Sequence, residues 1–322
     1  MFAVYAESFS SDAPLDGLVL GERPDPDVPD GWTTVTVKAA SLNHHDLWSL
    51  RGVGLKDEAL PMILGCDAAG LDEDGNEVVV HAVVSDPSWR GDETFDPKRS
   101  LLSERYQGTF ADKVAVPKVN VVPKPESLSF EEAACLPTAW LTAYRMLFTQ
   151  GGLKAGDTVL VQGAGGGVAT ALITLARAGG LKVLATSRDE AKRKRALEIG
   201  AHEVFESGER LPVKVDAVME TVGKATWSHS IRALRPGGRI VTSGHTSGPN
   251  LDDAELTRIF FLQLRVIGST MGTRTELASL VNLLDATGTR PLIDRCIPME
   301  QAPDGFAAMA EGDVFGKIVF TR

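Results

Sequence analysis

The sequence predicts an α/β fold with two domains, a doubly wound parallel sheet and a small β-barrel. Short strands separated by glycine and proline turns fill the first third of the chain, which is typical of a small barrel. From residue 157 onward, short apolar strands alternate with helical stretches, which is typical of a parallel sheet covered by helices. The length of 322 residues agrees with two domains.

The barrel domain is predicted from three segments. In residues 32–40, apolar Val35 and Val37 alternate with Thr34 and Thr36, as in a half-buried strand. Residues 75–84 follow an Asp-Gly turn signal and predict a more buried strand. Residues 108–117 predict a strand that stops at a proline.

The sequence changes character near residue 126. Ser129 and Glu132 have the spacing of a capping box, and helical apolar stretches follow, interrupted by Pro137. We therefore assign residues 1–125 to the barrel domain and 126–269 to the parallel-sheet domain, and expect residues 270–322 to return to the first domain. Strands of the parallel sheet are predicted at 158–163, 182–187, 202–205, 216–221, 239–244 and 265–270.

Composition excludes several classes of function. The net charge of −10 disfavours nucleic acid and anionic lipid as partners. Three scattered cysteines without a CxxC pair argue against a disulfide framework and a structural zinc lobe. No signal peptide or membrane helix is recognisable, so we expect a soluble cytoplasmic protein.

A glycine-rich turn between a strand and a helix predicts a dinucleotide site. Glycine lets the backbone turn tightly and approach a pyrophosphate, which then lies on N–H groups at the positive end of the helix. An unliganded flexible loop is the alternative, but the strand before, the helix after and the length of the βαβ unit disfavour it. The residues assigned to this turn are Gly163, Ala164, Gly165, Gly166, Gly167 and Val168.

The end of the second strand favours NADPH over NADH. An NAD site usually has an acidic residue here, but residues 181–188 contain none. Ser187, Arg188 and Lys192 offer a hydroxyl and two cations, which suit a 2′-phosphate. Two alternatives remain: the cations are only a solvated helix face, or Asp189 binds the ribose, although Asp189 has the position of a helix N-cap.

The pair His44-His45 raises the question of a metal site. Adjacent side chains project in different directions, so the two histidines are not expected to bind one metal together. Asn43 is expected to cap a short helix, with Asp46 at its N3 position. We interpret the histidines as surface or packing residues.

Several motifs together resemble the medium-chain dehydrogenase/reductase superfamily. The resemblance covers nearly the whole chain and rests on "SLNHHDLWSLRG", "PMILGCDAAG", "VLVQGAGGGVA", "IGSTMGT" and "GKIVF". It implies a GroES-like barrel domain that is split in sequence, a Rossmann-type domain, an active site between them, and a homodimer.

The zinc ligands of the alcohol dehydrogenases in this superfamily are not retained. Those enzymes have Cys at the position of Asn43, Gly-His-Glu where this chain has Gly65-Cys66-Asp67, and Cys near Thr138. At most Cys66, helped by Asp67, remains, and a catalytic zinc needs three good ligands. We therefore expect no metal, and a likeness to the zinc-independent, quinone oxidoreductase-like branch.

That likeness implies NADPH-dependent hydride transfer to a quinone or to the C=C bond of an α,β-unsaturated carbonyl compound, a small-molecule substrate. Asn43 is expected to donate a hydrogen bond to the substrate carbonyl, Trp48 to stack on the substrate, Asp46 to support Asn43 or the helix start, and Thr138 to line the pocket. Val222, Gly244, Ser269 and Met271 are expected to meet the cofactor. The alternatives are an enoyl-thioester reductase and a non-catalytic NADPH-binding or redox-sensing protein.

Overall fold

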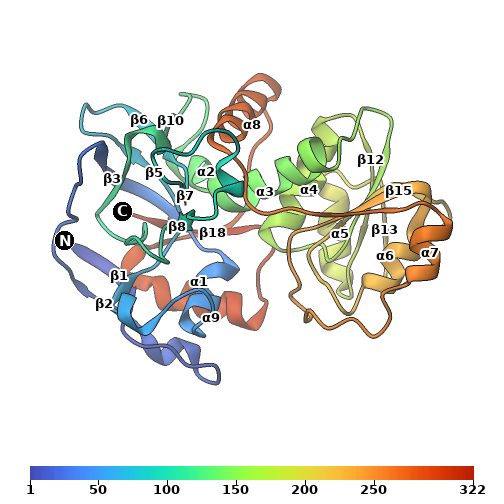
Figure 1. Ribbon diagram of the computed structural model, residues 1–322, viewed down its shortest axis with the longest axis horizontal. Helices are drawn as coiled ribbons and strands as arrows, with labels where there is room; N and C mark the ends of the chain where they lie inside the picture. The colour runs from blue at the N-terminus through green and yellow to red at the C-terminus, as the bar shows by residue number, and fades with distance from the viewer. The chain divides into compact units, whose positions relative to one another are not determined.

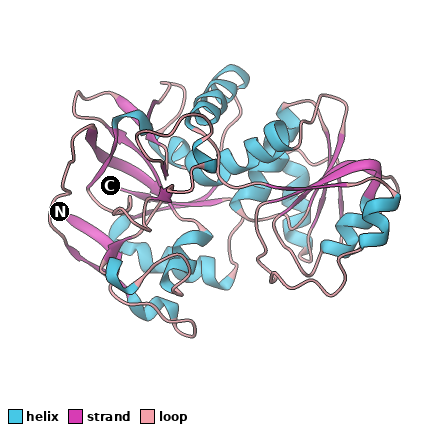
Figure 2. Cartoon of the chain, viewed as in Figure 1, coloured by secondary structure: helices cyan, strands magenta, loops and turns pink.

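The computed structural model describes residues 1–322, which form two compact units. The first unit contains Met1–Leu141 and Met271–Arg322, and the second contains Thr142–Thr270. The predicted domain boundary lies before residue 126, whereas the units divide after Leu141, eleven residues beyond the start of α2 at Phe130. Figures 1 and 2 show the chain by residue number and by secondary structure.

The first unit is built mainly from antiparallel strands. Its largest sheet has the order β10-β6-β5-β3-β18-β17, and β9 also pairs with β3. A second sheet has the order β2-β1-β4, and β7 pairs with β8. The strands are β1 (Phe2–Ala6), β2 (Leu18–Glu22), β3 (Trp32–Ser41), β4 (Met62–Ile63), β5 (Asp67–Leu71), β6 (Glu77–Val80), β7 (Val83–Val84), β8 (Ser100–Leu101), β9 (Lys113–Pro117), β10 (Val121–Pro123), β17 (Ile293–Pro298) and β18 (Lys317–Thr321).

Both ends of the chain contribute to this unit. β18 pairs antiparallel with β3, with Val319 opposite Ser41. The barrel-type domain is therefore split in sequence, as the fold prediction requires. Its helices are α1 (His44–Leu50), α2 (Phe130–Ala134), the π-helical turn η5 (Leu136–Trp140), α8 (Arg274–Thr287) and α9 (Ala302–Glu311), and α3 (Leu141–Tyr144) crosses the boundary between the units.

Two predicted strands of this unit are shorter than expected. The segment 75–84 is divided into β6 and β7, because Asn120 Nδ2 donates to the carbonyls of His81 and Val83, 2.8 and 2.7 Å away, in place of a ladder partner. The segment 108–117 becomes a strand only at Lys113, because Gly108 and Phe110 donate their N–H groups to the chain at residues 63–64.

The second unit is a six-stranded parallel sheet with the order β13-β12-β11-β14-β15-β16. The order reverses next to β11, which is the topological switch point at which nucleotides bind in such sheets. α4 and α5 pack on β11–β13, and α6 packs on β14 and β15. The elements are β11 (Thr158–Val161), β12 (Lys182–Thr186), β13 (Glu203–Phe205), β14 (Val215–Glu220), β15 (Leu234–Thr242), β16 (Arg265–Gly268), α4 (Gly167–Ala178), α5 (Glu190–Glu198), α6 (Trp227–Ala233), α7 (Leu256–Phe261) and the π-helical η6 (Arg145–Gln150).

The mixed α/β fold with a Rossmann-type parallel sheet is confirmed. Each predicted strand of this sheet is present. The inner strands contain apolar runs that can be buried on both faces, whereas the edge strands β13 and β16 are partly exposed. The capping box is also confirmed: Ser129 N donates to Glu132 Oε2 at 2.9 Å, and Glu132 N donates to Ser129 Oγ at 3.2 Å. No helix is long and apolar enough to span a membrane.

Candidate active site

The glycine turn follows β11 and leads into α4 in the second unit. Gly163 and Gly165 have φ values of +73° and +137°, a region that favours glycine. A Cβ at Gly163 would lie 2.7 Å from Val222, and one at Gly165 would lie 2.9 Å from Lys192 Cδ. No side chain caps α4 at Gly166, so the first N–H groups of the helix are available for an anion.

Lys192 and Val222 therefore both lie beside the turn. Both belong to the set predicted from the sequence, and both come from elements distant in sequence from the turn. The turn is held to the second strand, because Ala164 N donates to Thr186 O at 2.7 Å. The geometry brings together a cation, a helix N-terminus and a glycine backbone.

The end of β12 presents the predicted ribose-side residues. Arg188 is exposed, and Ser187 is buried and accepts the N–H of Asp189 at 3.2 Å. Asp189 caps α5, accepting the N–H groups of Ala191 and Lys192 at 2.7 and 3.1 Å, and these donors hold the pKa of its carboxyl below the usual value. The carboxylate of Asp189 is thus occupied by the helix, in agreement with its predicted role as an N-cap.

A residue that the sequence analysis missed organises the loop after β14. Glu220 is fully buried and accepts N–H groups from Val222 and Gly223 at 2.7 and 3.1 Å. The hydroxyls of Thr226 and Ser230 also donate to it, at 2.8 and 2.6 Å. Glu220 therefore fixes the loop that holds Val222 beside the turn. The sequence signal for Glu220 is an acidic residue at the carboxyl end of a predicted apolar strand.

The other predicted cofactor residues lie at the carboxyl ends of later strands. Gly244 follows β15, and Ser269 follows β16 and donates its N–H to Thr242 O at 2.8 Å. The hydroxyl of Ser269 is buried without a partner. Met271 has a φ of +47°, which is unusual for a residue with a side chain, and it belongs to the first unit.

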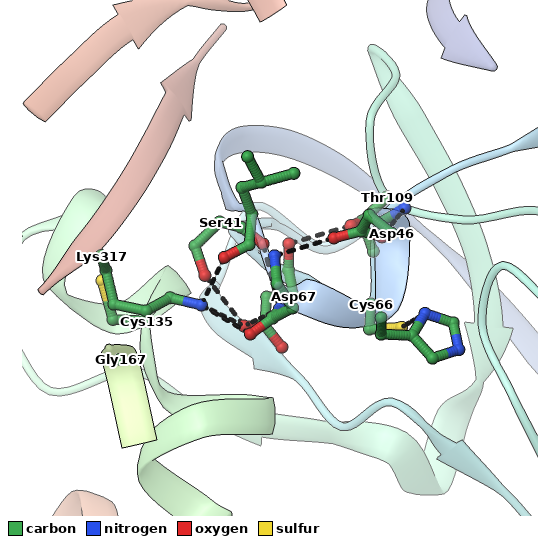
Figure 3. Close-up of polar contacts among 12 residues, drawn as sticks. Ser41, Asp46, Cys66, Asp67, Thr109, Cys135, Gly167 and Lys317 are labelled. Carbon is green, nitrogen blue, oxygen red and sulfur yellow. Dashed lines mark hydrogen bonds and ion pairs between the residues drawn. The ribbon is translucent and has the colours of Figure 1, made fainter. Parts of the chain in front are cut away.

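In the first unit, a buried polar network surrounds the start of α1 (Figure 3). Lys317, 2% exposed, donates to the carbonyl of Leu42 at 2.8 Å and to Asn43 Oδ1 at 2.7 Å, and lies 3.5 Å from Asp67 Oδ2. Asp67 is fully buried and also accepts from Ser41 Oγ at 2.8 Å. The three oxygen neighbours of the ammonium group compensate for the free energy that it loses when it is removed from water.

The amide of Asn43 is fully engaged in this network. Its Nδ2 donates to Asp67 Oδ2 at 2.8 Å and to Ser41 O at 3.2 Å, and its Oδ1 accepts from Lys317. Asn43 is at the same time the N-cap of α1, where it forms a capping box with Asp46. For Asn43 to donate to a substrate, as the sequence analysis expects, one of these two N–H contacts must be released.

Asp46 stabilises the start of α1 through hydrogen bonds to main-chain N–H groups. Its Oδ2 accepts the N–H of Asn43 at 2.8 Å, and its Oδ1 accepts the N–H of Gly65 at 3.0 Å. Burial raises the pKa of Asp46 to about 6, and both N–H donors oppose that rise. Asp46 therefore joins α1 to the chain before β5.

The remaining predicted substrate residues have distinct surroundings. Trp48 is partly buried, and its ring centroid lies 6.5 Å from that of His44, which is exposed. Thr138 is partly buried, and its hydroxyl oxygen is buried without a partner. A buried hydroxyl without a partner is costly, and a ligand oxygen could satisfy it.

His45 and Cys66 form a contact that the sequence analysis did not anticipate. His45 Nδ1 lies 3.4 Å from Cys66 Sγ, and His45 Nε2 lies 3.1 Å from Glu104 Oε1. Burial raises the pKa of the Cys66 thiol, which donates to Leu102 O at 3.2 Å. The two histidines do project differently, as expected, but only His44 is a surface residue.

The positions that match the zinc ligands of alcohol dehydrogenases do not suit a catalytic zinc. Of Asn43, Cys66 and Thr138, only Cys66 is a strong zinc ligand. The amide oxygen of Asn43 is already bound by the Lys317 ammonium group, whose positive charge opposes a second cation. These residues do not fit a catalytic zinc ion.

Comparison with known proteins identifies the family. Residues 29–126 match the alcohol dehydrogenase GroES-like domain, and residues 167–286 match the zinc-binding dehydrogenase domain. A crystal structure described as an NAD-dependent alcohol dehydrogenase is 32% identical, covers 100% of both chains and has a TM-score of 0.92.

Two curated relatives are named for different substrates. Acryloyl-coenzyme A reductase of Sulfurisphaera tokodaii is 26% identical over 95% of this chain and 97% of its own. Quinone oxidoreductase of Mus musculus is 29% identical over 86% of this chain and 85% of its own. These likenesses, with the observed fold and the glycine turn, show that the chain is an oxidoreductase of the medium-chain dehydrogenase/reductase superfamily, whose members use nicotinamide cofactors.

Proposed function

We propose that this protein transfers hydride from NADPH to a quinone or to the C=C bond of an α,β-unsaturated carbonyl compound without a catalytic metal. The contact that carries the proposal is that of Lys317 with Asn43: an ammonium group is bound where an alcohol dehydrogenase has a zinc ligand. Without a Lewis acid, the alkoxide of alcohol oxidation lacks stabilisation. Hydride addition to a conjugated acceptor gives an enolate-like oxygen that a hydrogen bond stabilises, and uptake of one proton then completes the reduction.

The cofactor part of the proposal rests on the second unit. The diphosphate lies on the N–H groups at the start of α4, and Lys192 lies beside it. Arg188 and Ser187 bind the 2′-phosphate of NADPH. The carboxylate of Asp189 already caps α5, so it is not available for the ribose hydroxyls of NADH. This favours NADPH over NADH. When bound, the cofactor supplies the hydride.

The substrate part rests on the first unit. Trp48 offers an aromatic face to a flat substrate. Thr138 is the second candidate donor beside Asn43, because its hydroxyl has no partner in the protein. Asn43 either donates after releasing one of its two N–H contacts, or positions the backbone at the start of α1. Asp46, with both carboxylate oxygens accepting N–H groups, supports Asn43.

Reduction of an enoyl thioester is the second candidate function. The acryloyl-coenzyme A reductase likeness favours it, and an acryloyl thioester is itself an α,β-unsaturated carbonyl compound. One panel separates the candidates: NADPH oxidation is followed with quinones, enones and enoyl thioesters, and metal content is measured in the same preparation. Turnover of quinones or enones supports the first function, and turnover of thioesters alone supports the second. NADPH binding without turnover supports a redox-sensing role, and turnover of alcohols that requires zinc contradicts the proposal.

We also propose that the protein is a homodimer that pairs through β16. This strand is at the edge of the parallel sheet, and Val266 on it is 47% exposed. Phe260 and Phe261 of α7, just before it, are 68% and 76% exposed. An exposed edge with large apolar neighbours is typical of an interface. Phe261→Glu is expected to convert the dimer to a monomer in sedimentation velocity, and a monomeric parent protein contradicts the proposal.

A further inference from the structure

The strongest unexplained arrangement outside the reaction residues lies between α1 and the chain at residues 102–104. Three ligand-type atoms approach one another there: His45 Nδ1, Cys66 Sγ and Ser103 Oγ. The three separations are 3.4 Å between nitrogen and sulfur, 3.5 Å between nitrogen and the hydroxyl, and 3.6 Å between sulfur and the hydroxyl. The three atoms therefore form a nearly equilateral triangle.

These separations match one face of a tetrahedral zinc site. With zinc bonds of about 2.3 Å to sulfur and about 2.0–2.1 Å to nitrogen and oxygen, tetrahedral angles place the ligand atoms about 3.4–3.6 Å apart. The fourth oxygen comes from Asp46: the ligand atoms of His45, Asp46 and Cys66 all lie within 4.8 Å of one another, and the carboxylate moves toward the triangle to complete the tetrahedron. Each carboxylate oxygen of Asp46 accepts one N–H group and retains a second lone pair.

The surroundings of the triangle favour a metal over a chance cluster. His45 Nε2 faces Glu104 Oε1 at 3.1 Å, the carboxylate–histidine arrangement that orients a metal-binding imidazole and raises its basicity. With Nε2 donating to Glu104, the lone pair of Nδ1 is directed toward the triangle. Ser103 is fully buried and has a φ of +64°, an unusual conformation for serine that the surrounding structure maintains.

We propose that His45, Cys66 and Ser103, with Asp46, form a structural site for Zn²⁺. A thiolate and an imidazole select zinc over magnesium or calcium. On binding, the S–H bond of Cys66 is broken, its proton passes to solvent, and the sulfur bonds to zinc. Cys66, Ser103 and Asp46 are at most 1% exposed and the His45 side chain is 17% exposed, so protein atoms surround most of the coordination, as in structural rather than catalytic sites.

This site differs from a catalytic zinc site of the superfamily. Of the three positions that match the catalytic zinc ligands of alcohol dehydrogenases, the proposed site uses only Cys66, and neither Asn43 nor Thr138. A zinc ion here joins α1, the chain before β5 and the segment 102–104, which are distant in sequence. The proposal does not depend on the reductase activity, and its test does not measure that activity.

Cobalt(II) added alone is the probe, because a cobalt–thiolate bond gives a charge-transfer absorption. The parent protein carries Cys296→Ser, since Cys296 is exposed and could bind metal adventitiously. We expect one equivalent of cobalt to produce the charge-transfer band. Cys135→Ser is the matched control: Cys135 is also buried and donates to a main-chain carbonyl, Glu131 O, at 3.2 Å, and this variant should keep the band.

Cys66→Ser should lose the band, and His45→Gln should weaken cobalt binding at least tenfold. With zinc alone at a hundredfold excess over its dissociation constant, the unfolding temperature of the parent should rise by about 5–10 °C, and that of His45→Gln should not. His45→Gln decides the question if Cys66→Ser does not fold. A parent without the band, a band that persists in Cys66→Ser, or equal binding by His45→Gln overturns the proposal.

Discussion

Replacing Lys317 with methionine removes a buried cation from the network at the start of α1. Lys317 is 2% exposed, and its ammonium group has three oxygen neighbours, those of Leu42, Asn43 and Asp67. Asp67 is fully buried, and its second oxygen already lacks a partner. The variant therefore leaves a buried carboxylate without a counter-charge.

Breaking a buried ion pair by removing one partner costs about 3–5 kcal/mol, much more than an exposed pair contributes. Methionine is long, flexible and apolar, so the cavity contribution is small. We therefore expect Lys317→Met to lower the free energy of unfolding of the first unit by about 4 kcal/mol. Urea denaturation at pH 7, followed by tryptophan fluorescence, measures this change.

The double variant Lys317→Met/Asp67→Asn is the matched control, because it removes both charges. We expect it to recover at least half of the lost stability, since no unpaired charge remains. Two results would refute the idea that the ion pair compensates for its own burial. The first is a loss of stability below about 1 kcal/mol for Lys317→Met. The second is a double variant whose loss of stability equals the sum of the losses of Lys317→Met and Asp67→Asn.

Three further predictions concern single side chains. Arg188→Ala should weaken NADPH binding at least tenfold, about 1.4 kcal/mol, and NADH binding much less; equal losses in calorimetric titrations would remove the 2′-phosphate assignment. Asn43→Ala should slow turnover and leave NADPH affinity intact, and an unchanged kcat would restrict Asn43 to a structural role. Burial lowers the pKa of His81, which faces Glu93 and Arg274, so the unfolded chain binds the proton more tightly and stability should fall as pH drops below about 6.5. His81→Gln should flatten that fall in urea titrations at pH 7 and pH 5; a parallel pH dependence in both proteins would contradict it.

Local patterns predicted the parts of the fold that depend on local physics. The βαβ turn was recognisable because its backbone geometry requires glycine at Gly163 and Gly165, where φ is positive and a Cβ would be crowded. The capping box at Ser129 and the N-cap at Asp189 were recognisable because a helix end needs an acceptor close in sequence. The alternation of apolar and polar residues likewise predicted β3, because one face of that strand is buried.

Contacts between distant residues were not predictable in this way. Lys317 and Asp67 are 250 positions apart, and the pairing of β3 with both β18 and β5 brings them together. The triangle of His45, Cys66 and Ser103 likewise joins three segments that no periodicity relates. The same strand pairing brings Lys317 and Asp67 to the amide of Asn43. Local sequence could not show that this amide is already hydrogen-bonded within the protein.

A crystal structure of the protein with bound NADPH tests the central claim most directly. We expect the diphosphate within hydrogen-bonding distance of the N–H groups of Gly166, Gly167 and Val168, and the 2′-phosphate paired with Arg188. A cofactor whose diphosphate lies elsewhere, or a glycine turn that stays unliganded at saturating NADPH, would contradict it.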